Sequence, residues 1–228
     1  MLKGGISFKG DYHDINQDCF LAREYKDGYI LVVSDGMGSK KMSQYGSKAV
    51  CEAVYEVIST KHINLDIISF KDVLYMCHGE WKKRLYSYDI TQCYATMLVV
   101  VVTDKKVRAG RLGDGFIGIY TDQGVECLFD RKDHYFVNET DCLCEQFGRD
   151  KLEILEIEYN SLFGVVACTD GIEIGTMQEN ELAGFTRDLV DEYRKGDEES
   201  VKNEIESWLI DWPGRDDKTM AFLMEGEK

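Results

Sequence analysis

The sequence predicts an α+β fold, a four-layer α-β-β-α sandwich in which two antiparallel sheets pack face to face between helices. Three observations support this prediction. Short β-rich runs are separated by turns that are too short for a crossover helix, which favours antiparallel pairing. The runs fall into blocks, with two helical stretches after the first block and two near the C-terminal end. The 228 residues are 44% hydrophobic, so we expect one domain over 1–228 with a core of its own.

The first part of the chain is expected to form three strands followed by two helices. The second and third strands are joined through Lys26-Asp27-Gly28, which is typical of a hairpin turn. Over 43–60 and again over 70–85, apolar residues recur at helical spacing, which predicts amphipathic helices with ordinary core-facing stripes. The three expected strands are 6–8, 19–24 and 29–34.

The middle of the chain, 93–129, is expected to be an antiparallel meander, because only short turns separate its β-rich runs. The following stretch, 130–150, is polar and irregular and contains His134, for which we expect a structural role. Two strands, two amphipathic helices and a last strand complete the fold. The strands expected from residue 93 onward are 93–103, 107–112, 116–120, 125–129, 152–157, 163–169 and 219–224.

Charge and composition exclude several partners. A net charge of −15 repels phosphate backbones and anionic headgroups, so neither nucleic acid nor a membrane surface is expected, whereas divalent cations are attracted. The longest strongly apolar stretch, 97–102, is far below the roughly 20 residues of a membrane helix. An apolar export segment is missing at the N-terminus, so a cytoplasmic location is expected. The eight cysteines lack a zinc-like or pairing pattern and are expected to be reduced.

An apolar, β-branched run ends in Asp-Gly three times, at Asp35, Asp114 and Asp170. A carboxylate at the end of a buried strand is held rigidly, and the glycine lets the next carbonyl approach an ion. Oxygen ligands of this kind suit Mg²⁺ or Mn²⁺. The alternative for one pair alone is a hairpin turn, as expected for Asp27-Gly28. No return strand flanks Asp35 or Asp170, so that alternative fails there, whereas strands on both sides of Asp114 leave either role open.

Six motifs follow one another along nearly the whole chain. They are NQD at 16–18, VVSDGMGS at 32–39, YATMLVVVV at 94–102, GDG at 113–115, CTDGI at 168–172 and GRDDKT at 214–219. In order, spacing and strand context they resemble the metal-dependent Ser/Thr protein phosphatases of type 2C, and a compact bacterial branch in particular. The resemblance implies a β-sandwich flanked by helix pairs, with a two-metal centre at one end of the sheets.

The resemblance also implies which residues are catalytic. Asp35 would bridge two ions, Mg²⁺ or Mn²⁺, and the carbonyl of Gly36 would bind one of them. Asp170 and Asp216 would bind the other. The family pattern Asp-Asn-x-Ser/Thr aligns Asp216 with the Asp and Asp217 with the Asn, so Asp216 is the expected ligand.

Other positions differ from the family or carry conditional roles. In many bacterial members the residue at Asp114 binds a third, weaker ion. His13 stands where many members have a phosphate-binding Arg, and it could donate to a phosphate oxygen or protonate the leaving alkoxide. Gln17 replaces a Glu, so that a water-mediated carboxylate contact becomes an amide contact. Asp18 would then orient the ligands without binding an ion.

Four cationic side chains lie near the candidate ligands in the sequence. Arg111 and Arg215 could steer phosphate or act as ion-pair partners of acidic residues, and these two roles stay open. Lys40 and Lys41 are expected to be solvated at the entry of a helix.

The implied reaction is hydrolysis of phosphoserine and phosphothreonine in a phosphorylated protein, opposite a cognate Ser/Thr kinase. Two ions would lower the pKa of a bridging water and hold the phosphate for in-line attack, without a phosphoenzyme. Two alternatives remain. The chain could be a catalytically weak member that acts as a phosphoprotein-binding or regulatory module, which His13 and Gln17 favour, or a phosphatase for small phosphate esters.

Overall fold

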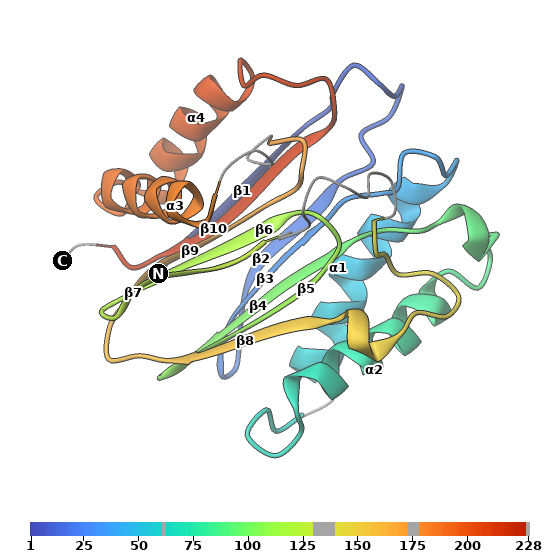
Figure 1. Ribbon diagram of the computed structural model, residues 1–228, viewed down its shortest axis with the longest axis horizontal. Helices are drawn as coiled ribbons and strands as arrows, with labels where there is room; N and C mark the ends of the chain where they lie inside the picture. The colour runs from blue at the N-terminus through green and yellow to red at the C-terminus, as the bar shows by residue number, and fades with distance from the viewer. Residues whose placement is uncertain (61–62, 130–139, 173–177, 227–228) are drawn as a thin grey trace.

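The computed structural model describes residues 1–60, 63–129, 140–172 and 178–226, which form two antiparallel five-stranded sheets (Figure 1). One sheet has the order β1 (Leu2–Phe8), β10 (Lys218–Met224), β9 (Leu162–Cys168), β6 (Phe116–Thr121) and β7 (Gly124–Leu128). The other has the order β2 (Cys19–Tyr25), β3 (Gly28–Ser34), β4 (Met97–Thr103), β5 (Lys106–Leu112) and β8 (Glu153–Glu158).

Helices cover the outer face of each sheet. The β2–β8 sheet carries α1 (Ser43–Thr60) and α2 (Phe70–Arg84), and the β1–β7 sheet carries α3 (Glu179–Tyr193) and α4 (Glu198–Leu209) (Figure 1). Two single turns of 3₁₀-helix, η1 (Ile90–Gln92) and η2 (Arg149–Lys151), lie in the connections. The four layers confirm the predicted α+β sandwich. Within the described residues no helix is both long and apolar enough to span a membrane.

Alternation along the central strands explains the layers. Successive side chains of a strand point to opposite faces, so an all-apolar strand can face a helix layer and the other sheet at once. In β3 and β4, one set of side chains packs between the sheets and the other packs under α1 and α2. The inter-sheet set includes Leu31, Val33, Leu98 and Val100, and the helix-facing set includes Ile30, Val32, Val99 and Val101.

Two predicted features of the fold are wrong. Residues 93–129 do not form a meander, because β5 pairs with β4 and β8 while β6 pairs with β7 and β9 in the other sheet. The connection 113–115 is therefore a corner between sheets. A short Gly-rich connection looks the same in sequence whether it closes a hairpin or crosses between packed sheets. The strand expected from residue 93 begins only at Met97, after the turn of η1. His134 lies outside the described residues.

Candidate active site

Strand register brings the ends of β3, β5 and β9 to one end of the sandwich. In one sheet, Val33, Leu98 and Arg111 lie in one row across β3, β4 and β5. In the other sheet, Phe116, Cys168 and Met220 form the corresponding row across β6, β9 and β10. The residues that follow Val33, Arg111 and Cys168 along the chain converge. One carboxylate oxygen from each of Asp35, Asp114 and Asp170 lies within 4.8 Å of the other two. The structure thus brings together all three aspartates of the repeated Asp-Gly motif, including Asp114.

Asp18 is the fourth carboxylate of this group. We use the name acidic centre for the five residues Asp18, Asp35, Asp114, Asp170 and Asp216. The carboxyl groups of Asp18 and Asp35 lie close enough to share a proton. The hydroxyl of Thr169 donates to Oδ2 of Asp18 over 2.9 Å. Burial raises the pKa of Asp18 to about 7, against the opposing contacts with Asp35, Thr219 and Thr169.

Mutual repulsion marks the rest of the acidic centre. Burial, followed by the charges of Asp18 and Asp170, raises the pKa of Asp35 well above its ordinary value. Burial also raises the pKa of Asp170 to about 7, followed by the charges of Asp114 and Asp216. Asp170 lies at the solvent-exposed edge of the group. Burial and the neighbouring carboxylates therefore make Asp35 and Asp170 costly to ionise.

The chemistry of this group fits a divalent cation. Oδ1 of Asp18 and Oδ1 of Asp114 are buried and receive no hydrogen bond. Among the residues that the structure describes, no lysine or arginine forms an ion pair with any member of the acidic centre. Gathered carboxylate oxygens without a counter-charge are the donor set that Mg²⁺ and Mn²⁺ prefer.

Asp217 has a different task from its neighbour. Its side chain is 4% exposed, and both oxygens accept backbone hydrogen bonds, from Gly10 N over 2.7 Å and from Gln17 N over 2.6 Å. It ties the 10–17 segment to the start of β10. Of the two adjacent aspartates, only Asp216 raises the pKa of Asp170 among the largest contributions. Asp216 therefore stays the predicted ligand of the two, and Asp217 has a structural contact of its own.

The glycines after the aspartates are required by close backbone packing. A β-carbon at Gly36 would lie 2.6 Å from the carbonyl oxygen of Gln17, and one at Gly171 would lie 1.8 Å from that of Asp217. Both contacts are shorter than any side chain tolerates. Glycine is therefore required after Asp35 and after Asp170 because the backbone of another chain segment packs against it. The sequence alone does not reveal this reason.

His13 and Gln17 lie beside the loop that follows Asp35. A β-carbon at Gly38 would be 2.8 Å from Nε2 of His13 and 3.9 Å from Oε1 of Gln17. The Gln17 oxygen is buried without a hydrogen-bond partner, and His13 is half-buried. The Lys9 ammonium donates to the His13 carbonyl over 3.1 Å, which holds this segment in place. Both side chains therefore lie beside Gly38, three residues after Asp35.

Three threonines that sequence reasoning missed hold the aspartates. Thr96 accepts from Asp35 N over 2.9 Å through its hydroxyl, Thr169 donates to Asp18, and the Thr140 hydroxyl donates to Oδ2 of Asp114 over 2.6 Å. Thr96 and Thr169 lie inside the motifs YATM and CTDG, so their position offered a signal. Thr140 lies within the stretch 130–150 that was expected to be irregular, where no pattern pointed to it.

Arg111, Arg215 and Lys40 each contact a residue outside the acidic centre. Arg111 is buried, donates to the Gly113 carbonyl and pairs with Glu153 over 2.6 Å, which favours a structural role over phosphate steering. The guanidinium of Arg215 lies 5.0 Å from the ring centre of Tyr12. The ammonium of Lys40 lies over the Tyr94 ring at 4.4 Å, and is therefore not simply solvated as expected.

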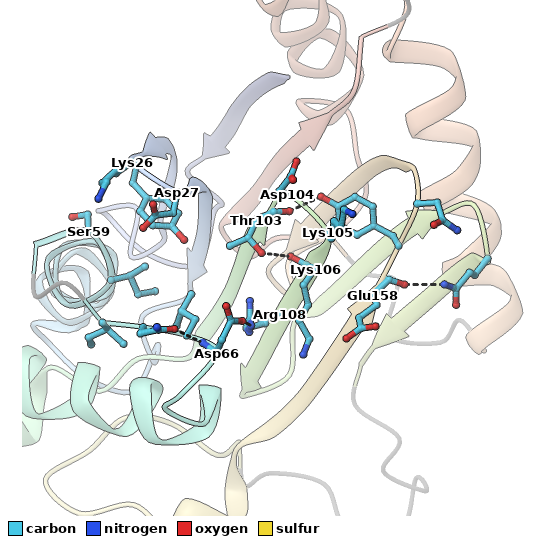
Figure 2. A pocket seen from close by; sticks show the side chains of 18 residues that line it. Lys26, Asp27, Ser59, Asp66, Thr103, Asp104, Lys105, Lys106, Arg108 and Glu158 are labelled. Atoms are coloured by element: carbon cyan, nitrogen blue, oxygen red, sulfur yellow. Dashed lines mark hydrogen bonds and ion pairs between the residues drawn. The ribbon is translucent and has the colours of Figure 1, made fainter.

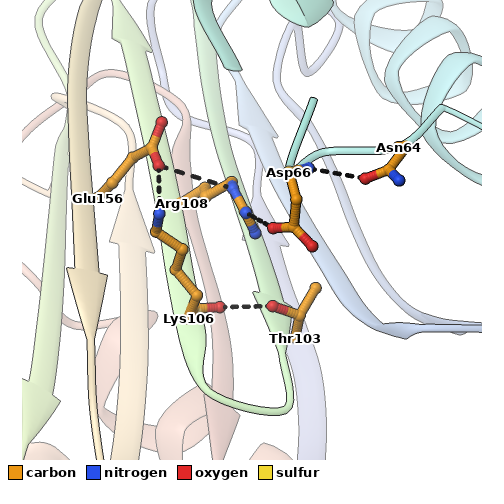
Figure 3. A network of polar contacts seen from close by, with 6 residues as sticks. All are labelled: Asn64, Asp66, Thr103, Lys106, Arg108 and Glu156. Atoms are coloured by element: carbon orange, nitrogen blue, oxygen red, sulfur yellow. Dashed lines mark hydrogen bonds and ion pairs between the residues drawn. The ribbon is translucent and has the colours of Figure 1, made fainter. Parts of the chain in front are cut away.

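A cavity of about 1080 Å³ lies at the opposite end of the sandwich, and Figure 2 shows the side chains that line it. It is lined by the β2–β3 and β4–β5 turns and by the stretch before α2. Its floor holds Arg108, which is 2% exposed and pairs with Asp66, while Lys106 pairs with Glu156 over 3.0 Å (Figure 3). Charges paired in this way fasten the stretch before α2 to the sheet. The acidic centre, rather than this cavity, is the candidate active site.

Residues 12–210 match the family model of protein phosphatase 2C. The chain belongs to this family, which confirms the resemblance of its motifs, and it is an enzyme of the Ser/Thr phosphatase class. No curated protein matches the chain in sequence.

Solved structures of bacterial phosphatases share the fold. A bacterial serine phosphatase superposes with a TM-score of 0.71 at 20% identity, over 100% of this chain and 99% of the other. Serine/threonine phosphatase Stp1 from Staphylococcus aureus gives 0.73 at 18% identity, over 98% and 95%. The catalytic domain of the serine threonine protein phosphatase PstP, in complex with two manganese ions, gives 0.68 at 12% identity, over 96% of both chains.

Proposed function

We propose that this protein is a metal-dependent phosphatase that hydrolyses phosphoserine and phosphothreonine in proteins. The observation that carries the proposal is the convergence of Asp35, Asp114 and Asp170, with raised pKa values for Asp35 and Asp170 and no paired lysine or arginine among the described residues. Membership of the protein phosphatase 2C family supports the reaction class.

Asp35, the Gly36 carbonyl, Asp170 and Asp216 would hold two ions, Mg²⁺ or Mn²⁺, with Asp114 available to a third. The two manganese ions bound by PstP support this number. When bound, such ions supply an activated water and neutralise the phosphate charge. They also explain how a chain with a net charge of −15 can accept a phosphate dianion.

The residues of the chain itself position the reactants. Water oxygen attacks phosphorus opposite the Ser or Thr oxygen, the bond from phosphorus to that oxygen breaks, and the leaving alkoxide takes a proton. His13, beside the loop that follows Asp35, would donate this proton from Nε2 or donate a hydrogen bond to a phosphate oxygen. Asp18, held by the Thr169 hydroxyl, would fix the orientation of Asp35.

The finer features of this function are part of the proposal. The substrate would be a phosphorylated protein, opposite a cognate Ser/Thr kinase, in the cytoplasm. We also propose that 1–228 acts as a single catalytic domain, because residues from both sheets build the acidic centre.

The decisive experiment measures hydrolysis of p-nitrophenyl phosphate and of a phosphothreonine peptide, each with Mn²⁺ and with EDTA. Wild type should be active only with metal, and Asp35→Asn should lose more than about a hundredfold in rate, because a ligand is removed. Asp27→Asn is the matched control. Asp27 also precedes a glycine, but it lies at the other end of the sandwich, so this variant should retain full activity.

Three outcomes would overturn the proposal. Activity that persists in EDTA would contradict a metal-dependent reaction. A protein that binds Mn²⁺ but hydrolyses neither substrate would be a phosphoprotein-binding or regulatory module. Hydrolysis of the aryl phosphate without hydrolysis of the peptide would point instead to small phosphate esters as substrates.

A further inference from the structure

A row of side chains on α2 contacts the segment 140–149, which runs beside this helix (Figure 1). The three helix residues follow one another at intervals of three, so each is a neighbour of the next on the helix surface. The contacts are Asp72 with Arg149, Tyr75 with Phe147, and His78 with Cys144. As the helix advances, the partner comes earlier in the chain. The segment 140–149 therefore runs antiparallel to α2.

The His78 contact is the buried one of the three. The His78 side chain is 3% exposed, and its Nε2 lies 2.7 Å from the carbonyl oxygen of Cys144. A carbonyl oxygen can only accept, so Nε2 carries the hydrogen and donates it. The ring also packs edge-on against Phe147, with centroids 4.8 Å apart, and stacks on Trp81 at 5.8 Å. Both the donor and the shape of the imidazole are used.

The other two contacts of α2 are more exposed. The side chains of Asp72 and Arg149 are 46% and 48% exposed, and an ion pair in water contributes little to stability. Tyr75 is an exposed side chain as well, and its ring centre lies 5.8 Å from that of Phe147. His78 is therefore the residue of α2 that holds the segment 140–149 most firmly.

The residues just before this carbonyl reach the acidic centre. Leu143 N donates to the Ala95 carbonyl over 2.8 Å, and Ala95 in turn forms a bridge with Gly36. Three residues before Leu143, the Thr140 hydroxyl donates to Oδ2 of Asp114 over 2.6 Å. The contact on α2 and the contact on Asp114 thus lie only four residues apart along one segment.

We propose that His78 is a positioning residue of this enzyme, acting through the backbone of the segment 140–149. By holding the Cys144 carbonyl on α2, it keeps Leu143 paired with Ala95 and keeps the Thr140 hydroxyl on Asp114. Without this donor the segment loses its buried attachment, and Asp114 loses a fixed orientation. The effect on Asp114 rests on the proposed metal-dependent function, whereas the attachment to α2 does not.

The first test measures hydrogen exchange of the full chain in EDTA by mass spectrometry. His78→Phe keeps an aromatic ring and removes the donor. Peptides covering 140–147 should then exchange about tenfold faster than in wild type, because the Cys144 carbonyl has lost its partner. His78→Gln, whose amide can donate in place of Nε2, should restore slow exchange. Unchanged exchange in His78→Phe would overturn the proposal, and so would a His78→Gln variant that exchanges as fast as His78→Phe.

Two controls separate this effect from a general loss of stability. Tyr159→Phe removes a hydroxyl that donates to the Thr103 carbonyl over 2.6 Å at the other end of the sandwich, and it should leave the 140–147 peptides unchanged. Peptides from α3 should keep their wild-type exchange in His78→Phe, and equally fast exchange throughout the chain would overturn the proposal. If circular dichroism shows that His78→Phe does not fold, Phe147→Leu loosens the same contact from the segment, since Phe147 is half-buried, and should speed exchange over 140–147.

The second test measures the coupling to the acidic centre by titration calorimetry with Mn²⁺. His78→Phe and Thr140→Val should each weaken binding of the ion held by Asp114 by about tenfold, as loss of a residue that supports a ligand does. Because both substitutions act through one segment, the double variant should lose little more than the larger single loss, and additive losses would overturn the coupling. Wild type that binds no Mn²⁺ would instead overturn the proposed function and leave the attachment to α2, which exchange in EDTA measures, standing.

Discussion

Asp18 should make the metal-free protein less stable as the pH rises. Burial raises its pKa from 3.8 to about 7. Between these values the folded state binds more protons than the unfolded state, so the free energy of unfolding decreases as pH increases through this window. The contribution is fully present below about pH 4 and is lost as the pH passes about 7. A shift of roughly three pKa units corresponds to about 4 kcal/mol.

The perturbation that isolates this effect is Asp18→Asn, which has nearly the same shape and carries no charge. Because Asp18 and Asp35 compete for one proton, we expect the gain to lie below that limit, at roughly 2–4 kcal/mol at pH 8. In a protein of this size, such a gain corresponds to a melting temperature higher by roughly 5–15 °C. Below about pH 4 the Asp18 carboxyl is neutral in both the folded and the unfolded protein, so the difference should disappear there, and at pH 5 it should already be less than half of its value at pH 8.

The assay is urea unfolding followed by circular dichroism in EDTA, at pH 5 and at pH 8. Asp122→Asn is the control of opposite sign, since Asp122 accepts backbone hydrogen bonds from Ser161 and Asn160 that lower its pKa. It should therefore be destabilised at pH 8. Adding Mn²⁺ should stabilise wild type by mass action. If metal-free Asp18→Asn is less stable than wild type at pH 8, Asp18 is not an ill-accommodated charge, and the reasoning about the acidic centre is refuted.

Three further substitutions separate the roles of single residues. His13→Ala should slow hydrolysis of a phosphothreonine peptide by about 10²–10⁴-fold and barely affect p-nitrophenyl phosphate, if Nε2 protonates the alkoxide, because nitrophenolate leaves unprotonated. Equal losses on both substrates, rescued by His13→Arg, would establish a phosphate contact instead. Asp217→Ala leaves the Gly10 and Gln17 N–H groups without acceptors and should lower the free energy of unfolding by about 2–6 kcal/mol in urea titrations; an unchanged value would contradict this. Arg108→Met should lower the free energy of unfolding by roughly 2 kcal/mol. This loss is smaller than that of a fully buried ion pair because the Asp66 side chain is 84% exposed. The substitution should leave kcat and KM unchanged. A changed KM would mean that the distal cavity communicates with the acidic centre.

Helices and strand positions could be predicted from the sequence because their signals are local. The apolar stripe of α1 runs through Ser43–Thr60, the same bounds that the periodicity predicts. The passage of the chain from one sheet to the other between β5 and β6 could not be predicted, since pairing depends on which sheet a strand joins and not on its own residues. The same limit applies to Thr140, whose hydroxyl reaches Asp114 only because the fold returns a distant segment to the corner between the sheets.

Strand direction explains why identical Asp-Gly dipeptides have different roles. A strand of seven residues such as β3 spans about 23 Å, so Asp27-Gly28 and Asp35-Gly36, which flank it, lie at opposite ends of the sandwich. The strands β5 and β9, like β3, begin at the end opposite the acidic centre, and the Asp-Gly pair that follows each of them therefore arrives at the same place as Asp35. In an antiparallel sandwich, two residues that each follow a strand can meet only if their strands run the same way, whereas Asp18 and Asp216 reach the same end because they precede β2 and β10, which run the other way. The number of strand reversals between two motifs, rather than the dipeptide, decides whether their carboxylates can converge.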